Sequence, residues 1–216
     1  LMISSAPARR DTKLAIMEQF RNSDLLELYG STEQGWATLL RPEEQITKLG
    51  SVGRELTGCG RIKLIGENGQ EVGEGEVGEL WVRGLGLLRE YHRRPEVNAV
   101  CLLPDGWFRT GDLARRDGDG NHFIVGRLKD MIRRSHENVA ASEVEAAIAK
   151  HPAVSSVGVV GVSDDKRGEE IKAFVVLAPA MLGDDKVARD VLSFAAQHLA
   201  PFKVPRYVQF MDELPL

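Results

Sequence analysis

The sequence has few cysteines and no long apolar run, and each shortage argues against a class of protein. Its two cysteines, Cys59 and Cys101, are isolated, so they form neither a metal-binding pattern nor a disulfide framework. No stretch approaches the roughly 20 consecutive apolar residues of a transmembrane helix. Residues 1–11 lack the basic and apolar regions of a secretory signal. We therefore expect a cytoplasmic protein without a membrane span.

An excess of basic charge is also missing. The 216 residues include 28 Lys and Arg against 32 Asp and Glu, which gives a formal net charge of -4. A protein that binds nucleic acid needs a basic surface, so we expect no nucleic-acid partner. What the chain does have is glycine, with 22 residues that cluster in loops.

The front of the chain predicts mostly β structure. Apolar residues at helical spacing predict one helix within the first 25 or so residues, namely Leu14, Ile16, Met17 and Phe20. A short strand at 25–28 then enters a polar turn at 29–33. Between residues 51 and 86, apolar and polar residues alternate, which predicts a small antiparallel sheet or barrel-like portion without a helix. Residues 121–125 predict one strand of a hairpin.

The back of the chain predicts a compact β-α-β-β-α-β unit, so the fold class is α+β. Its first helix begins at a capping box formed by Ser142 and Glu145, and Pro152 stops it. The remaining predicted elements are strands at 154–162 and 171–177, a helix at 187–199 and a strand at 207–211. We place the domain boundary near Arg127, with residues 1–126 in front of it and 127–216 behind.

Four glycine-containing motifs follow one another along the chain. They are YGSTE at 29–33, GELWVRG at 78–84, DGWFRTGD at 105–112 and GRLKDMIRRSHENVAASEVE at 126–145. In this order and spacing they resemble the adenylate-forming superfamily, which contains acyl-CoA synthetases, peptide-synthetase adenylation domains and luciferases. Residues 149–177, the run APFKVPRY at 200–207 and LREY at 88–91 look most like carnitine/crotonobetaine or medium-chain acid–CoA ligases.

The first motif has residue types that suit a nucleotide. Glycine lets the backbone approach a ligand closely, Ser31 and Thr32 offer hydroxyls, and Glu33 is a hard-oxygen ligand for Mg²⁺. The resemblance implies that Tyr29 and Gly30 line the adenine pocket, that Thr32 contacts the α-phosphate and that Glu33 holds Mg²⁺. Taken alone, the pentapeptide also fits an ordinary strand-end turn with a solvated glutamate.

Other nucleotide contacts follow from the resemblance. Asp112 has two carboxylate oxygens that suit the two ribose hydroxyls, although an Asp after Gly is also a common turn residue. Arg127 is assigned to the ribose and phosphate side, with a surface salt bridge as the alternative. The run Ser5, Ala6 and Pro7 matches a loop that stacks on adenine in the family, and it fits a surface loop equally well.

The resemblance implies a reaction in two half-steps that uses ATP, Mg²⁺ and coenzyme A. A carboxylate first attacks the α-phosphate to give an acyl-adenylate, and a thiol then displaces AMP after the small domain swings about a hinge. Lys129 matches the hinge position. The loop Ser135, His136 and Glu137 matches the one that lies against the pantetheine tunnel. His136 stands where most relatives have glycine, so it either weakens thioester formation or points to solvent.

Two family elements are missing from the sequence. The chain begins after the Gly/Ser/Thr-rich phosphate loop and stops before the C-terminal lysine, so we expect a piece of a protein more than twice as long. That piece alone should not adenylate. The substrate is expected to be a small- or medium-chain carboxylic acid, whose identity the sequence does not reveal. A homodimer is one option at the level of the family.

Two other functions remain open. An adenylation enzyme that loads a carrier protein would share these motifs, and so would a degenerate module without catalysis. The aromatic residues Trp81, Trp107 and Phe108 are interpreted as packing, and neither cysteine has the positioned base that a thiol nucleophile needs. No histidine has neighbours at metal-ligand spacing, so three of them are interpreted as surface or capping residues: His122, His151 and His198.

Overall fold

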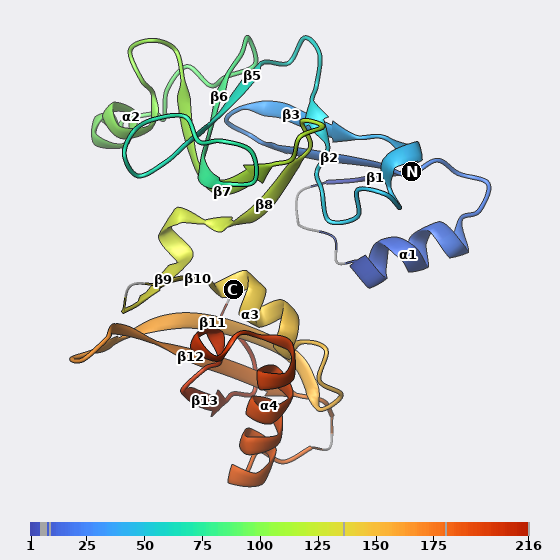
Figure 1. Cartoon of the computed structure of the whole chain (residues 1–216), viewed down its shortest axis with the longest axis vertical. Helices are drawn as coiled ribbons and strands as arrows, with labels where there is room; N and C mark the ends of the chain where they lie inside the picture. The colour runs from blue at the N-terminus through green and yellow to red at the C-terminus, as the bar shows by residue number, and fades with distance from the viewer. Residues whose placement is uncertain (5–7, 9, 136, 180, 216) are drawn as a thin grey trace. The chain divides into compact units, whose positions relative to one another are not determined.

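The structure is a computed structural model that describes residues 1–4, 8, 10–135, 137–179 and 181–215. The fold is α+β, as predicted, and the chain divides into two compact units at residues 1–125 and 126–216 (Figure 1). Each unit has its own apolar core. Within the described residues, every helix is too short or too polar to cross a membrane.

The first unit begins with a four-stranded sheet in the order β1-β2-β3-β4. Strand β1 is parallel to β2, and the other pairs are antiparallel. The elements of this part are β1 (Met2–Ile3), α1 (Arg10–Gln19), β2 (Leu26–Ser31), β3 (Gly35–Leu40), the short 3-10 helix η1 (Pro42–Glu44) and β4 (Arg54–Glu55).

A second four-stranded sheet completes the first unit, in the order β5-β6-β7-β8. It consists of β5 (Arg61–Ile65), β6 (Val77–Arg83), β7 (Phe108–Arg116) and β8 (His122–Arg127), with α2 (Pro95–Cys101) between β6 and β7. Four of the five apolar residues in the alternating pattern lie in its core, namely Ile62, Leu64, Leu80 and Val82, which confirms the period-two prediction there. The fifth, Val77 at the start of β6, is 46% exposed. Among the described residues no pairing joins β8 back to β5, so the sheet is not a closed barrel.

Three local predictions in the first unit were wrong. The strand at 25–28 continues to Ser31, so it takes in half of the predicted turn, and β3 and α2 were not predicted. The apolar stripe of α1 is not its buried face, because Leu14 and Phe20 are 40% and 49% exposed. The buried residue of α1 is Lys13, whose ammonium group pairs with the buried carboxylate of Glu27 on β2.

The second unit has the predicted β-α-β-β-α-β order, with its first β element formed by a hairpin. Helices α3 and α4 pack against a five-stranded sheet in the order β10-β9-β12-β11, with β13 parallel to β12. The elements are η2 (Leu128–Asp130), β9 (Met131–Arg134), β10 (Glu137–Ala140), α3 (Ala141–Ile148), β11 (Val154–Asp164), β12 (Gly168–Leu177), α4 (Asp185–His198), η3 (Pro201–Lys203) and β13 (Tyr207–Phe210).

The capping box predicted for α3 is wrong. The N-cap residue is Ala140, which forms no side-chain cap hydrogen bond. Glu145 instead accepts a 2.8 Å hydrogen bond from the backbone N–H of Val159 on β11. A carboxylate one turn into a helix can accept a hydrogen bond either from the start of its own helix or from a neighbouring strand. Here it accepts one from the sheet that packs on the helix.

Two of the three histidines interpreted as surface or capping residues are buried. His151 is 6% exposed, and its Nδ1 accepts a hydrogen bond from the backbone N–H of Ala153 while its Nε2 lies 3.2 Å from Asp190. His122 is 1% exposed at the start of β8. His198 is exposed in the last turn of α4, as predicted.

We expect His122 to make the first unit less stable in acid. Burial is the main cause that lowers its pKa below the ordinary value of about 6.5, and nearby Arg116 lowers it further, while Glu55 and Asp117 oppose the shift. Below pH 6.5 the unfolded chain therefore binds more protons than the folded one, so stability falls as pH falls, by up to about 1.4 kcal/mol per unit. Urea midpoints from pH 8 to pH 5 measure this slope. The variant His122→Gln should flatten the slope, and an unchanged slope would exclude His122 as its source.

Candidate active site

The turn between β2 and β3 presents the residues of the YGSTE motif. Strand β2 ends at Ser31, which pairs with Gly35 across the hairpin, and Ser31 and Thr32 are exposed. Gly30 has no room for a side chain, because a Cβ there would lie 2.1 Å from the carbonyl O of Gly35. The close approach of the two strands therefore requires glycine at this position and keeps the turn tight.

A bulge in β7 positions the TGD motif. The register pairs Trp81 with Arg109 and Glu79 with Leu113, so Leu80 alone faces the three residues 110–112. Gly111 has φ +73°, which glycine adopts without strain, and the Asp112 N–H donates a 3.0 Å hydrogen bond to Thr110 Oγ1. Bulges commonly redirect a side chain near an active site, and this one redirects Asp112.

The two motifs meet at Tyr29 and Asp112, which are 83 residues apart in the sequence. The hydroxyl of Tyr29 donates a 2.7 Å hydrogen bond to Asp112 Oδ2. Burial, followed by the nearby charge of Asp112, raises the pKa of Tyr29, so this hydroxyl keeps its proton. Gln34 is 1% exposed beside the pair, and its amide forms no hydrogen bond with the described residues at ordinary distances.

Glu33 is held at both its backbone and its side chain. Its carbonyl O accepts a 2.6 Å hydrogen bond from the N–H of Leu88, and its Oε1 accepts one of 2.9 Å from the hydroxyl of Tyr91. Asn98 of α2 fixes Tyr91 in turn, because its amide bonds both the N–H and the carbonyl O of that residue, at 2.8 and 3.0 Å. Burial and the charge of Glu33 raise the pKa of Tyr91 to about 12, so the tyrosine remains a donor.

The oxygen atoms at this turn suit a Mg²⁺ ion that is held mainly by the phosphates of a bound substrate. Among the described residues there is no cluster of three or more His, Cys, Asp or Glu side chains that could enclose a metal. Mg²⁺ usually keeps several waters and binds proteins through one or two carboxylates together with substrate phosphates. Glu33, beside the hydroxyls of Ser31 and Thr32, offers one such carboxylate.

The structure gives no support to a thiol nucleophile at this site. Cys101 ends α2, and burial is the main cause that raises the pKa of its thiol. The charge of Glu33 raises that pKa further, and Arg109 lowers it only in part. A neutral thiol is a poor nucleophile, so the prediction made from the sequence remains in place.

The other predicted site residues lie in the second unit or outside the described residues. Arg127 is exposed at the end of β8, and Lys129 is exposed in η2. Ser135 and Glu137 are exposed at the tip of the β9–β10 hairpin. The described residues do not include four of the predicted positions: Ser5, Ala6, Pro7 and His136.

Sequence reasoning missed the residues that support the site. Tyr91, Asn98 and Thr110 act on Glu33 and Asp112 through hydrogen bonds that span up to 58 residues of sequence. Tyr91 belongs to the LREY segment, which contributed only to the resemblance and suggested no partner for the tyrosine. No local pattern identified the tyrosine as a partner of Glu33, because that contact depends on how α2 follows β6.

In comparison with known proteins, each of the two units contains a match to a protein family. Residues 1–92 match the AMP-binding enzyme family, and residues 143–216 match the AMP-binding enzyme C-terminal domain. The chain therefore belongs to the AMP-binding, adenylate-forming enzymes, which confirms the resemblance carried by the four motifs.

Its relatives within this family include acid–CoA ligases. The chain is 38% identical to the crotonobetaine/carnitine–CoA ligase of Proteus mirabilis, over 95% of this chain and 39% of that protein. It is 35% identical to the mitochondrial medium-chain acyl-CoA ligase ACSF2 of Mus musculus, over 100% and 35% of the two chains. A similar solved structure is o-succinylbenzoate CoA synthetase (MenE) from Bacillus subtilis in complex with the acyl-adenylate intermediate OSB-AMP. Its TM-score is 0.89 at 30% identity, covering 99% of this chain and 42% of that one. The chain thus spans well under half the length of these relatives.

Proposed function

We propose that the protein carrying this chain is an ATP-dependent acid–CoA ligase. It would activate a small- or medium-chain carboxylic acid as an acyl-adenylate and then transfer the acyl group to the thiol of coenzyme A, with release of pyrophosphate and AMP. The observation that carries the proposal is the hydrogen bond of Tyr29 to Asp112, which joins two nucleotide motifs. The similarity to acid–CoA ligases supports the same reaction class.

The first unit supplies groups for the adenylation half-reaction. Asp112 accepts the hydrogen bond of the Tyr29 hydroxyl at Oδ2, and this bond orients its carboxylate for the two ribose hydroxyls. The absence of a Cβ at Gly30 leaves the β2 backbone close to Gly35 and keeps the turn narrow. Mg²⁺, when bound, would neutralise phosphate charge, and Glu33 would be its protein ligand.

The second unit supplies groups for the thioester half-reaction. We assign Arg127 to the nucleotide and Lys129 to the hinge, and both are exposed. Ser135 and Glu137, at the tip of the β9–β10 hairpin, are assigned to the pantetheine arm of coenzyme A, and so is His136, which lies outside the described residues. The chain alone, without the rest of such an enzyme, is expected not to form the adenylate.

The proposal is tested by pyrophosphate exchange into ATP and by hydroxamate trapping across a panel of acids, with the full-length protein. The variant Asp112→Ala should lower kcat/KM for ATP about 100-fold, since two hydrogen bonds to a charged group are lost. The matched control is Asp105→Ala, an exposed aspartate of the same motif, which should behave as wild type. If no acid of the panel supports pyrophosphate exchange by the wild-type protein, the proposal is overturned in favour of a non-catalytic module.

The acceptor is tested separately. The acyl-adenylate, once trapped, is offered free coenzyme A and a phosphopantetheinylated carrier protein. Thioester formation with free coenzyme A is the expected result. Transfer to the carrier protein alone would replace the ligase by an adenylation enzyme of the carrier-loading kind, with the first half-reaction unchanged.

A further inference from the structure

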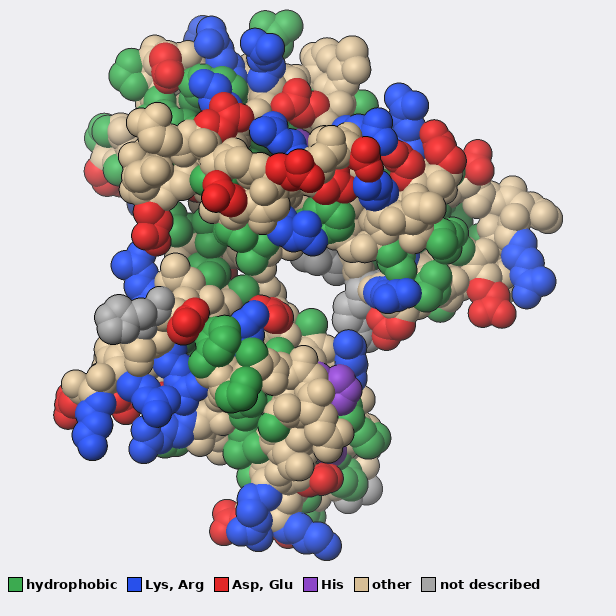
Figure 2. All heavy atoms as spheres, viewed as in Figure 1, with side chains coloured by type: hydrophobic (Ala, Val, Ile, Leu, Met, Phe, Trp, Pro, Cys, Tyr) green, Lys and Arg blue, Asp and Glu red, His purple; other side chains and the backbone are tan. Residues whose placement is uncertain are grey.

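A buried carboxylate in the second unit is surrounded by three arginines. Glu170 lies on β12 with no exposed surface. Its carboxylate oxygens lie 2.8 Å from Arg134 Nε, 3.0 Å from an Arg167 guanidinium nitrogen and 3.6 Å from one of Arg206. In the view of Figure 2, basic side chains gather over the part of this unit that holds the β9–β10 hairpin and the β11–β12 turn.

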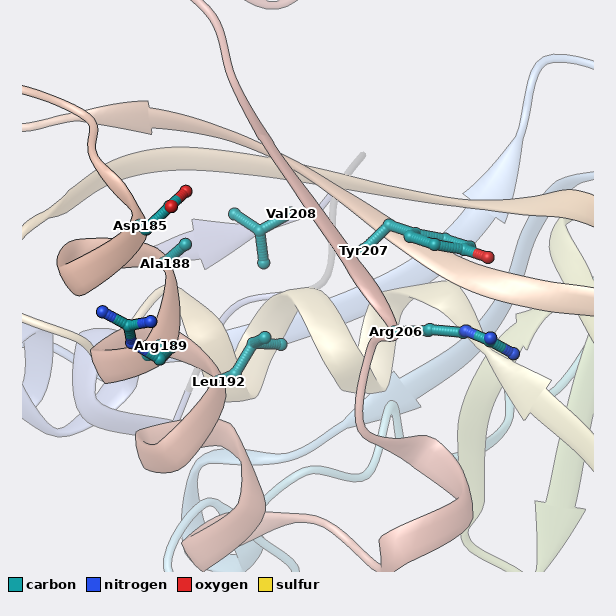
Figure 3. A pocket seen from close by; sticks show the side chains of 7 residues that line it. All are labelled: Asp185, Ala188, Arg189, Leu192, Arg206, Tyr207 and Val208. Carbon is teal, nitrogen blue, oxygen red and sulfur yellow. The ribbon is translucent and has the colours of Figure 1, made fainter.

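The three arginines come from three different elements. Arg134 ends β9, Arg167 lies in the turn before β12, and Arg206 directly precedes β13. Figure 3 shows Arg206 extending away from Arg189 and Leu192 of α4, with which it lines a shallow groove. An ionised carboxylate without exposure is stable only when it is well paired, so Glu170 ties these three segments together.

The β9–β10 hairpin is anchored differently at its base and at its tip. At its base, Ile132 and Val139 belong to the apolar core of the unit. At its tip, one registered pair, Arg134 with Gly168, joins β9 to β12. Among the described residues, hydrogen bonds that involve side chains join β9 at the tip to Glu169 and Glu170 of β12 and to the carbonyl O of Phe202, which accepts a 2.6 Å hydrogen bond from Arg134.

The tip also holds a backbone conformation that needs support. Ser135 has φ +59°, a left-handed conformation that residues other than glycine adopt only at a cost. Its N–H donates a 2.7 Å hydrogen bond to the carbonyl O of Arg167, and Arg167 is itself paired with Glu170. Glu170 therefore pairs with residues on both sides of this hydrogen bond. Arg134 directly precedes Ser135, and Arg167 provides the carbonyl that accepts the bond.

We propose that Glu170 is a positioning residue for the thioester half-reaction, because it fixes the tip of the β9–β10 hairpin through Arg134 and Arg167. This inference rests on the proposed function, in which the tip approaches the thiol substrate. Loss of the carboxylate would leave three guanidinium groups facing one another, and their repulsion would open the tip while the apolar base stays in place. Adenylation, for which Tyr29, Glu33 and Asp112 lie in the first unit, would not depend on Glu170.

The test uses Glu170→Gln in the full-length protein, with each half-reaction measured alone. Pyrophosphate exchange should stay within about twofold of wild type. Single-turnover transfer from the preformed acyl-adenylate to coenzyme A should fall about 10- to 100-fold, the range expected when a reacting loop is misplaced. Glu170→Asp, which keeps the charge, should recover part of that rate. Hydrogen exchange at the Ser135 amide should speed up in Glu170→Gln while amides of the α3 core keep their protection.

The control is Glu143→Gln, which removes an exposed carboxylate paired with Lys203 in the same unit. Both of its half-reactions should match wild type. Equal losses in the two half-reactions of Glu170→Gln, or unchanged thioester transfer, would overturn the inference while leaving the proposed function intact. If Glu170→Gln does not fold, Arg167→Gln, which removes one of the two pairs through which Glu170 holds the tip, must show a smaller defect confined to thioester transfer. An Arg167→Gln variant with wild-type thioester transfer would count against the inference. A wild-type protein that forms no thioester would instead overturn the proposed function itself.

Discussion

Replacement of Glu33 by glutamine is expected to slow adenylation by about 100- to 1,000-fold, the range found when one group that stabilises transition-state charge is removed. Glutamine keeps the shape of the side chain and can still accept the hydrogen bond that Tyr91 donates to Oε1. It loses the charge that Mg²⁺ prefers in a ligand. Pyrophosphate exchange measured over a range of Mg²⁺ concentrations should show a weaker apparent affinity for the metal in the variant.

Two further variants separate charge from position. Tyr91→Phe removes only the hydroxyl that orients Glu33, so its loss should be smaller, about 3- to 10-fold, in line with one hydrogen bond. Glu67→Gln, an exposed glutamate in a turn of the same unit, should exchange pyrophosphate at the wild-type rate. If Glu33→Gln exchanges pyrophosphate at the wild-type rate and with the wild-type affinity for Mg²⁺, Glu33 is not a metal ligand.

The second large effect concerns stability, and it comes from a side chain outside the site. Lys13 is 1% exposed in α1, and its ammonium group pairs with Glu27, which is 4% exposed, and lies 3.5 Å from the carbonyl O of Ser51. The variant Lys13→Met leaves a buried carboxylate without its cation, which should lower the free energy of unfolding by about 4 kcal/mol. The urea midpoint of the transition that involves the first unit measures the loss.

The pH dependence of this variant has a definite sign. Burial already raises the pKa of Glu27, against the opposing effect of Lys13, so loss of the lysine should raise it further. The folded variant then binds more protons than the unfolded chain above the ordinary glutamate pKa of about 4.3, so its stability falls as pH rises through that window. The deficit should therefore shrink in acid. The double variant Lys13→Met with Glu27→Met should recover most of the loss at pH 7, and a double variant as unstable as the single one would contradict the ion-pair account.

Lys13 also shows where a sequence pattern stops being informative. The helix was predicted correctly from the spacing of Leu14, Met17 and Phe20, but its buried side was not. A lysine in an amphipathic pattern indicates solvent unless a buried partner exists, and Glu27 lies fourteen residues away on a strand. The same limit applies to His122, whose burial follows from the strands around it. Alternation in β5 and β6 was easier to interpret, because successive residues of a strand point to opposite faces of the sheet, so an apolar residue indicates the buried face directly.

The candidate site divides in a similar way. Tyr29, Glu33 and Asp112 were predicted because they lie within short motifs. The hydrogen bond between Tyr29 and Asp112 and the clamp of Asn98 on Tyr91 were not predicted. They join segments from different parts of the chain, so their partners become apparent only when the sheet and α2 are in place. The role of Glu170 was equally hidden, because it lies in the polar run 163–170 between the strands predicted at 154–162 and 171–177, and nothing in that run indicates that its last residue is buried.

The bulge in β7 has a consequence for how this site can change. Three residues face Leu80 where a regular ladder would place one, so the strand carries two additional residues, an even number. An even insertion leaves the inward and outward faces of the strand in step, and Phe108 and Ala114 are both buried on either side of it. A β7 shorter by two residues would bury the same side chains and lose Asp112 from its place. The sheet can therefore gain or lose Asp112, the carboxylate that we propose binds ribose, without a change in its other pairings.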